Sequence, residues 1–503
     1  MKPVLSGNVG SSSKEKVVDR KEVERRARIA IKRIKQEIKE LMKGCEHETL
    51  FHLVALLPNI FAELSKKQVT QEKIYVKPSW FRCMIATSLA LSELLPDYLP
   101  LKTPSMFSLD AFKESFERLI KISLKFFNLA WWIFIRDNKY IDRIVVDREF
   151  KPAPYFSEKN KDAITSYINA LYQRREDYLN WLIWQYHHLC HHTELLEAID
   201  NYLDSNHGFR LEDLGNASEY LKSFYEKCVK EEESPIISRN ELHKVFARNL
   251  RDIRAHKLLK ALIFNENDEN RDLLRAPLIP LRGGDLLIAG FVFNPYIHFD
   301  AWISYIMERD PKVRDVYANV VGDEFEKYVI SILCKSGIAK IYPKVIISES
   351  KFPEMRECLK RLKKERQFEI DIVAVTDNSI YLISCKGGKK EIPKAYISRY
   401  WLFPTEKEII RRIGENLHEV DEIVEETSCL EKHKAVVRQL FGVTAERITP
   451  VIVYAQIQPL AISEFRRKFN VPDDLIIATQ SSLPQLLNYN IRTHVPSANV
   501  LKP

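Results

Sequence analysis

The stretches Glu369-Ile370-Asp371-Ile372-Val373-Ala374 and Tyr381-Leu382-Ile383-Ser384-Cys385-Lys386 decide how the C-terminal part of this 503-residue chain folds. Both are rich in branched and aromatic residues and have turn residues between them, so they predict neighbouring β-strands over 368–375 and 379–386. Residues i and i+2 share a face of a strand, so Glu369 and Asp371 point the same way, as do Ser384 and Lys386. Buried strands seldom carry unpartnered charges, so we expect Asp371 and Lys386 side by side at strand ends that open to solvent.

The segments around these strands predict a mixed α/β domain. A helix over 322–336 carries Gly322-Asp323-Glu324-Phe325-Glu326 and is closed by Gly337. Counting this helix, the predicted order is αβββαβαβ, and mixed ordering of this kind is typical of an α/β or α+β sandwich. The remaining predicted elements are strands over 340–348, 449–455 and 475–478, and helices over 404–440 and 462–469.

The first 300 residues predict a different kind of structure, almost entirely α-helical. Residues 1–13 are rich in Gly and Ser and are expected to form a disordered tail, and residues 14–300 form a helical region. A connector helix over 301–320 then leads into a domain over 321–503, so the chain is multidomain. Apolar residues at three- and four-residue spacing indicate helices over 14–43, 48–65, 79–95, 108–136, 159–204, 211–231 and 238–263, and an apolar run indicates a strand over 286–293.

Asp371, Lys386 and Glu326 are the residue types that metal-assisted phosphodiester hydrolysis needs. A hard cation neutralises the nonbridging phosphate oxygens and lowers the pKa of an attacking water. Mg²⁺ takes oxygen ligands, usually one or two carboxylates together with water and phosphate, and Asp371 suits this role. Lys386 can orient the water and stabilise charge that develops on phosphorus, and Glu326 can add a second carboxylate. An ordinary ion pair between Asp371 and Lys386 is the alternative.

These motifs resemble the PD-(D/E)XK nuclease superfamily, which has the restriction-endonuclease-like fold, in its Mrr-like or Holliday-junction-resolvase-like branches. The resemblance covers about residues 320–480 and maps the helix acid of the family to Glu326, the strand acid to Asp371 and the lysine to Lys386. It implies a Mg²⁺- or Mn²⁺-dependent endonuclease that acts on DNA in repair, recombination or defence, with an αβββαβ core. It also implies that the backbone carbonyl of Cys385 helps to hold the metal.

Ser384 departs from the family pattern, which has an acidic residue or Gln two positions before the lysine. Serine is a neutral and weak metal ligand. Candidates that could compensate for the missing acid are Glu369, Glu326 and Glu391. If none does, the domain is a catalytically degenerate nuclease fold that binds nucleic acid or serves as a scaffold.

Two basic clusters flank the predicted site, as expected for a phosphate backbone partner. One comprises Lys360, Arg361, Lys363 and Lys364, and the other Lys389 and Lys390 beside two glycines. Solubilising loops would have the same composition. A metal-chelating spacing also occurs at His187, His188, His191 and His192, although a packed or surface helix is the better explanation.

Bulk composition sets wide limits on the function. The chain is 45% hydrophobic with a formal net charge of +8, which permits a polyanionic partner without requiring one. No CxxC pair, apolar leader or membrane-length apolar run is visible, so we expect a cytoplasmic protein without a membrane partner. A further alternative makes the helical region the functional unit, which binds a protein, with the C-terminal domain as a homodimerisation module.

Overall fold

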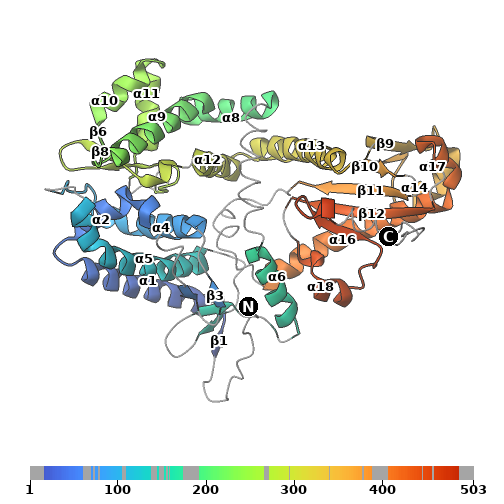
Figure 1. Cartoon of the computed structure of the whole chain (residues 1–503), viewed down its shortest axis with the longest axis horizontal. Helices are drawn as coiled ribbons and strands as arrows, with labels where there is room; N and C mark the ends of the chain where they lie inside the picture. Colours follow the sequence, from blue (N-terminus) through green and yellow to red (C-terminus); the bar gives the residue numbers. More distant parts are fainter. Residues whose placement is uncertain are drawn as a thin grey trace, which may run out of the picture. The chain divides into compact units, whose positions relative to one another are not determined.

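The computed structural model describes residues 16–60, 69–71, 74–76, 80–104, 109–137, 144–146, 152–154, 157, 159–173, 192–265, 271–293, 295–338, 340–376, 379–387, 406–443, 446–455 and 458–485. These residues divide into two compact units (Figure 1). The first lies within residues 1–157, 206–302 and 394–407, and the second within 158–205, 303–393 and 408–503. The predicted tail over 1–13 lies outside the described residues.

A five-stranded mixed sheet organises the second unit, in the order β13-β12-β11-β10-β9. Its strands are β9 (Lys340–Ser348), β10 (Gln367–Val375), β11 (Ser379–Lys386), β12 (Arg447–Tyr454) and β13 (Ile476–Thr479). β10 is antiparallel to both β9 and β11, whereas β11, β12 and β13 run parallel. The sequence therefore predicted all five strands within two residues of their ends. The helices of this unit also follow the predicted order, which confirms the mixed helix-and-sheet architecture at this level.

Helices cover the sheet on both faces. Long helix α13 (Pro311–Lys335) packs against β9, β10 and β11 through residues spaced by four, namely Val321, Phe325, Val329 and Leu333. Helices α14 (Arg356–Arg361), α16 (Glu406–Lys432) and α17 (Lys434–Phe441) share a second hydrophobic core with the alternate residues Ile380 and Leu382 of β11. Side chains that point to opposite faces of one strand thus enter two separate layers.

In the middle of β10, where this strand pairs with β9, the alternation of side chains between the two faces of the sheet is interrupted. Ile370 and Val373, three residues apart, both contribute to the core beneath α16 and α17, so the strict alternation of a strand shifts by one between them. Directly across, Lys344 has a left-handed backbone with φ of 49°. An irregularity of this kind re-aims the side chains next to it. Asp371 lies at this point of the strand.

Two helical boundaries differ from the prediction. The single connector helix expected over 301–320 is wrong, because α12 (Pro295–Arg309) ends there and α13 starts at Pro311. Pro311 has no N–H to continue α12, and the Asp310 carboxylate caps the new helix by accepting from the Lys312 and Val313 amides. The motif helix expected over 322–336 is therefore the second half of α13. The helix expected over 404–440 is likewise divided at His433 into α16 and α17.

Packed helices dominate the first unit, as predicted. Helix α1 (Arg20–Met42) begins at Asp19, whose side chain accepts from the Glu22 amide, and lies against α5 (Leu109–Asp137), which also contacts α4 (Trp80–Leu94). Helix α2 (Glu46–Ala55) also belongs to this unit, as do the small strands β1 (Lys16–Val18), β2 (Val69–Gln71), β3 (Ile74–Val76), β4 (Ile144–Val146) and β5 (Pro152–Pro154). Helix α6 (Lys161–Gln173) and all but the last residue of α8 (Thr193–Asn206) fall within the second unit. No helix among the described residues is long and apolar enough to cross a bilayer.

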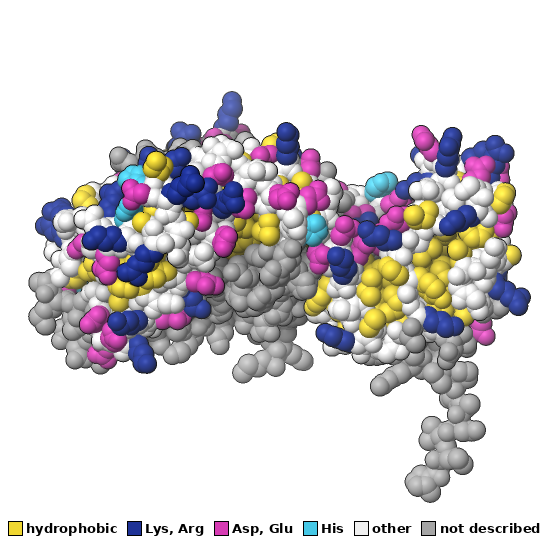
Figure 2. Space-filling model, turned by 90° about the horizontal axis from the view of Figure 1, so that it is seen from above, with side chains coloured by type: hydrophobic (Ala, Val, Ile, Leu, Met, Phe, Trp, Pro, Cys, Tyr) yellow, Lys and Arg dark blue, Asp and Glu magenta, His cyan; other side chains and the backbone are white. Residues whose placement is uncertain are grey.

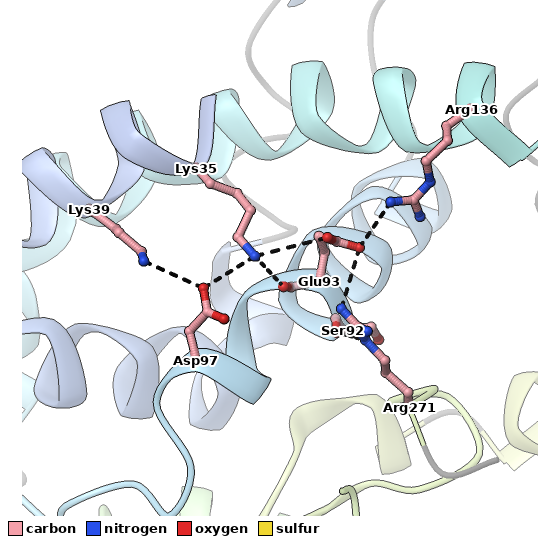
Figure 3. Close-up of polar contacts among 7 residues, drawn as sticks. All are labelled: Lys35, Lys39, Ser92, Glu93, Asp97, Arg136 and Arg271. Atoms are coloured by element: carbon pink, nitrogen blue, oxygen red, sulfur yellow. Dashed lines mark hydrogen bonds and ion pairs between the residues drawn. The ribbon is translucent and has the colours of Figure 1, made fainter. Parts of the chain in front are cut away.

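A network of charged residues centred on Glu93 of α4 connects separate segments of the first unit (Figure 3). The Glu93 carboxylate lies 3.9 Å from Lys35 Nζ of α1, 3.5 Å from Arg136 Nη1 of α5 and 3.5 Å from Arg271 Nη2. Only 17% of the Glu93 side chain is exposed, so these contacts are partly shielded from water. One carboxylate therefore links three segments that are distant in sequence.

We expect the substitution Glu93→Gln to lower the free energy of unfolding by about 1–3 kcal/mol, because it leaves three partly buried cations without their shared anion. Glu40→Gln removes an exposed carboxylate of α1 and should change stability by less than about 0.5 kcal/mol. Urea unfolding followed by tryptophan fluorescence measures both. Equal stability of the two variants would show that the network contributes nothing.

Candidate active site

Asp371 is held at the irregular point of β10 by the neighbouring strand. Its Oδ2 accepts a 2.6 Å hydrogen bond from the Cys385 amide and lies 3.4 Å from the Ser384 hydroxyl. Burial raises the pKa of Asp371, while the Cys385 N–H and the Lys386 ammonium act in the opposite direction. The carboxylate is thus fixed in position by a backbone bond, although its charged form is poorly solvated.

Glu326 approaches the same place from α13. Gly387, directly after β11, permits this approach, because a Cβ there would lie 2.9 Å from Cβ of Phe325 and 3.1 Å from the Val321 carbonyl oxygen. Burial raises the pKa of Glu326 to about 7, and the negative charge of Asp371 adds to the shift. The two acids therefore repel each other electrostatically across the end of the sheet.

Lys386 is the last residue of β11 and supplies positive charge at this point. In the parallel ladder it pairs with Tyr454, the last residue of β12. Its ammonium favours the ionised forms of Asp371 and of Glu422 on α16, opposing burial in both cases. Burial, Asp371 and Glu326 together raise the pKa of the Cys385 thiol far above its usual value. Asp371 is therefore bonded to the amide of the residue before Lys386, and the charges of Asp371, Glu326 and Lys386 all act on the Cys385 thiol.

Two further acids of α16, Glu422 and Glu426, were not predicted from sequence. Burial raises the pKa of Glu426 to about 8, assisted by the charges of Glu422 and Asp371. Burial also opposes ionisation of Glu422, but Lys364 Nζ, 2.6 Å from Oε1, outweighs it and lowers the Glu422 pKa. For Glu426 a signal was available in the sequence, because it recurs with the buried residues Glu419, Ile423 and Leu430 on the apolar side of the helix. Glu422 is only partly buried and does not follow this pattern.

Ser384 and Glu369 do not supply a third acid. The Ser384 hydroxyl donates to Asp371. Glu369 is exposed on β10, opposite Ile346. Its negative charge raises the pKa of Glu326 less than the charge of Asp371 does. Glu391 lies outside the described residues. Among the described residues, Glu422 and Glu426 of α16 are further acids that interact electrostatically with Asp371 and Lys386.

The predicted basic cluster divides into separate roles. Arg361 donates from Nη2 to Cys429 Sγ at 2.9 Å, and Lys364 pairs with Glu422. Lys360 lies 3.5 Å from Glu357, and Lys363 is exposed in a left-handed turn with φ of 56°. Lys360 and Lys363 thus remain solvent-facing candidates for phosphate contacts. Lys389 and Lys390, like His187, His188 and His191, lie outside the described residues.

The carboxylates fit a hard cation with few protein ligands. Asp371 and Glu326 supply the oxygen donors that Mg²⁺ prefers, in a place where their negative charges are otherwise poorly compensated. Within the described parts of the chain, no three carboxylate, imidazole or thiol side chains converge to hold a metal. A cation here would therefore have one or two carboxylate ligands, with the Cys385 carbonyl, water or substrate completing its shell.

Comparisons with known proteins assign neither a family nor a function to this chain. No family model and no curated protein matches the chain. A solved structure to which it is similar, protein VC1899 from Vibrio cholerae, has 12% sequence identity over 82% of this chain and 88% of that chain, with a TM-score of 0.16. Similarity at this level carries no argument about fold or function.

Proposed function

We propose that the second unit is a restriction-endonuclease-like domain that hydrolyses phosphodiester bonds of DNA with Mg²⁺ or Mn²⁺. One observation carries this proposal: Asp371 on β10 accepts from the amide of Cys385, the residue before Lys386 on β11, and Gly387 lies against Phe325, the residue before Glu326 on α13. The mixed sheet with α13 on one face and α16 on the other supports it, because this arrangement agrees with the αβββαβ order of the resemblance.

Each side chain has a distinct task in this proposal. Asp371 and Glu326 hold the cation, and the Cys385 amide keeps Asp371 oriented toward it. When bound, the cation neutralises phosphate charge and lowers the pKa of water. Lys386 orients the attacking water and stabilises the charge that grows on the phosphoryl oxygens. Exposed Lys360 and Lys363 contact the phosphate backbone.

The decisive experiment is a cleavage assay on the full chain with supercoiled plasmid, linear duplex and single-stranded DNA, and with RNA of matched sequence. We expect DNA cleavage that requires Mg²⁺ or Mn²⁺ and stops in EDTA. Ca²⁺ should support binding without cleavage. Cleavage that persists in EDTA would refute the proposed chemistry.

Glu326 predicts a pH dependence of metal affinity. With a pKa of about 7 instead of 4.5, Glu326 is mostly protonated at pH 6 and mostly ionised at pH 8, and only the ionised form can hold a cation. We expect Mn²⁺ binding, followed by electron paramagnetic resonance, to tighten about fivefold between pH 6 and pH 7 and about twofold between pH 7 and pH 8. Glu326→Gln should lose most of this step. The exposed-acid control Glu357→Gln should keep it, and an equal step in all three proteins would contradict the assignment.

A nucleic-acid-binding or scaffold protein with a degenerate nuclease fold is the second candidate. Ser384 and the absence of a three-ligand group among the described residues favour it. Tight, salt-dependent DNA binding without cleavage at any divalent metal concentration would establish this alternative.

A further inference from the structure

Residues 211–288 of the first unit contain a compact arrangement that the proposed nuclease site does not use. In chain order it comprises α9 (Leu211–Lys230), β6 (Ile236–Ser238), α10 (Arg239–Ala247), α11 (Asp252–Leu262), β7 (Leu278–Pro280) and β8 (Asp285–Ile288). The strands form an antiparallel sheet in the order β6-β8-β7, so the first strand pairs with the last. This combination of element order and strand order is that of a winged helix–turn–helix.

The helix–turn–helix itself consists of α10, the turn 248–251 and α11. Leu242 and Phe246 of α10 and Ala255, Leu258, Leu259 and Leu262 of α11 are buried and form its core. Arg254 Nη1 lies 3.8 Å from Asp213 Oδ2, which connects α11 to α9. The Phe264 amide, just after α11, donates to the Leu278 carbonyl of β7. These contacts fix α11 on the body of the module.

The outer face of α11 has the composition of a recognition surface. Ile253, His256, Lys257 and Lys260 recur at three- and four-residue spacing and are exposed, opposite the buried residues of the same helix. Ile253 is 73% exposed, an unusual position for a large apolar side chain at the start of a helix. Such a face combines hydrogen-bonding groups, cations and an apolar side chain that can contact the methyl group of thymine.

The positive charge is concentrated in the helix–turn–helix segment, whereas residues 211–288 as a whole are nearly balanced, with 13 Lys and Arg and 14 Asp and Glu. Residues 239–262 contain seven cations, Arg239, Lys244, Arg248, Arg251, Arg254, Lys257 and Lys260, against two acids, Glu241 and Asp252. The Nε2 atom of His243 lies 3.6 Å from the Asp252 carboxylate. Figure 2 shows Lys and Arg side chains with His among them on the end of the first unit where α10 and α11 lie. An excess of this sign matches a polyanion.

The turn between β7 and β8 forms a short wing. The Gly284 amide donates to the Leu281 carbonyl, and the Leu281 amide donates to the Asp285 carbonyl. Gly283 and Gly284 have φ of 112° and 96°, which allow this tight turn without side-chain strain. Arg282 is exposed at its tip, with Nη2 3.4 Å from His47 Nε2. A cation at a wing tip is placed to meet a phosphate beside the groove that a recognition helix enters.

We propose that residues 211–288 form a winged helix–turn–helix module that binds duplex DNA, with α11 in the major groove and Arg248, Arg251 and Arg282 on the flanking phosphates. B-form DNA is the chosen partner because its major groove, about 12 Å wide, admits an α-helix, whereas the corresponding groove of A-form RNA does not. The inference concerns a site separate from the proposed nuclease site and does not depend on cleavage.

The test measures binding by the full chain in EDTA, so that no metal-dependent cleavage contributes. A fluorescent 30-base-pair DNA duplex is titrated at several salt concentrations and followed by anisotropy. The triple variant Arg248→Gln, Arg251→Gln, Lys257→Gln removes three exposed charges of the module. Its matched control, Lys21→Gln, Arg28→Gln, Lys32→Gln, removes three exposed charges of α1 in the same unit.

We expect the module variant to bind roughly 10- to 100-fold more weakly at physiological salt, with the salt slope reduced by about two to three. The control should bind within about threefold of the parent, and duplex RNA of the same sequence should compete poorly. Circular dichroism and thermal melting check that both variants are folded. Equal losses in the two variants, unchanged binding by the module variant, or equal competition by duplex RNA would each overturn the proposal. None of these outcomes bears on the nuclease site, which the cleavage assay tests separately.

Discussion

Asp371→Asn should abolish both Mn²⁺ binding at the β10–β11 site and metal-dependent DNA cleavage, with a loss of cleavage of at least about 10³-fold. An amide cannot supply the negative charge that a hard cation requires, and losing such a ligand removes several kcal/mol of transition-state stabilisation. The amide oxygen can still accept the Cys385 N–H bond that holds position 371, so the fold should persist. The two measurements are single-turnover cleavage and Mn²⁺ titration by electron paramagnetic resonance.

Glu357→Gln is the matched control, because it removes an exposed carboxylate of α14 in the same unit. It should keep cleavage within about twofold of the parent. Asp371 also suffers from burial, so Asp371→Asn should melt at the same temperature as the parent or higher. A folded Asp371→Asn protein that still cleaves at the parental rate would exclude Asp371 as the metal ligand.

Lys386→Met should reduce cleavage by about 10²- to 10³-fold but leave Mn²⁺ binding intact or stronger. A single well-placed donor to developing charge contributes on this scale. Its ammonium also competes electrostatically with a cation for Asp371 and Glu422, so its removal should favour metal binding. Cleavage and metal affinity are therefore expected to change in opposite directions, which general damage to the site would not produce.

Lys351→Met provides the control for this substitution, since Lys351 is an exposed lysine of the same unit, before α14. It should change neither quantity by more than about twofold. An isolated ion pair between Asp371 and Lys386, without a catalytic role, predicts a different pattern. In that case Lys386→Met would lower stability and have no effect on cleavage beyond that of the control.

The local pattern of the sequence was sufficient for the strands and for half of the candidate site. Alternating branched residues between turn residues located β9 to β13, because a strand's period of two and its turns are set by neighbours in the chain. The same alternation placed Asp371 and Lys386 on adjoining strands. Glu326 was predicted from the family resemblance, which maps the helix acid to the last residue of Gly322-Asp323-Glu324-Phe325-Glu326.

Helix breaks were harder to predict where no residue of special conformation marks them. Pro311 ends α12 and could have been used, but it was taken as the interior of one connector helix. The turn 248–251 contains neither Gly nor Pro, and a single helix over 238–263 was predicted where α10 and α11 form. Their separation follows from packing of both apolar faces into one core with α9 and the β6-β8-β7 sheet.

Sequence patterns were enough to predict the helical first part, the strands of the sheet, and the positions of Asp371 and Lys386 on neighbouring strands. The interaction of Glu422 and Glu426 with this site, the ion pair between Lys364 and Glu422, and the raised pKa of Glu326, about 7, follow from the three-dimensional packing. The physical reason is range. Strands and helices follow from residues a few positions apart, whereas desolvation and charge coupling depend on which distant segments bury one another.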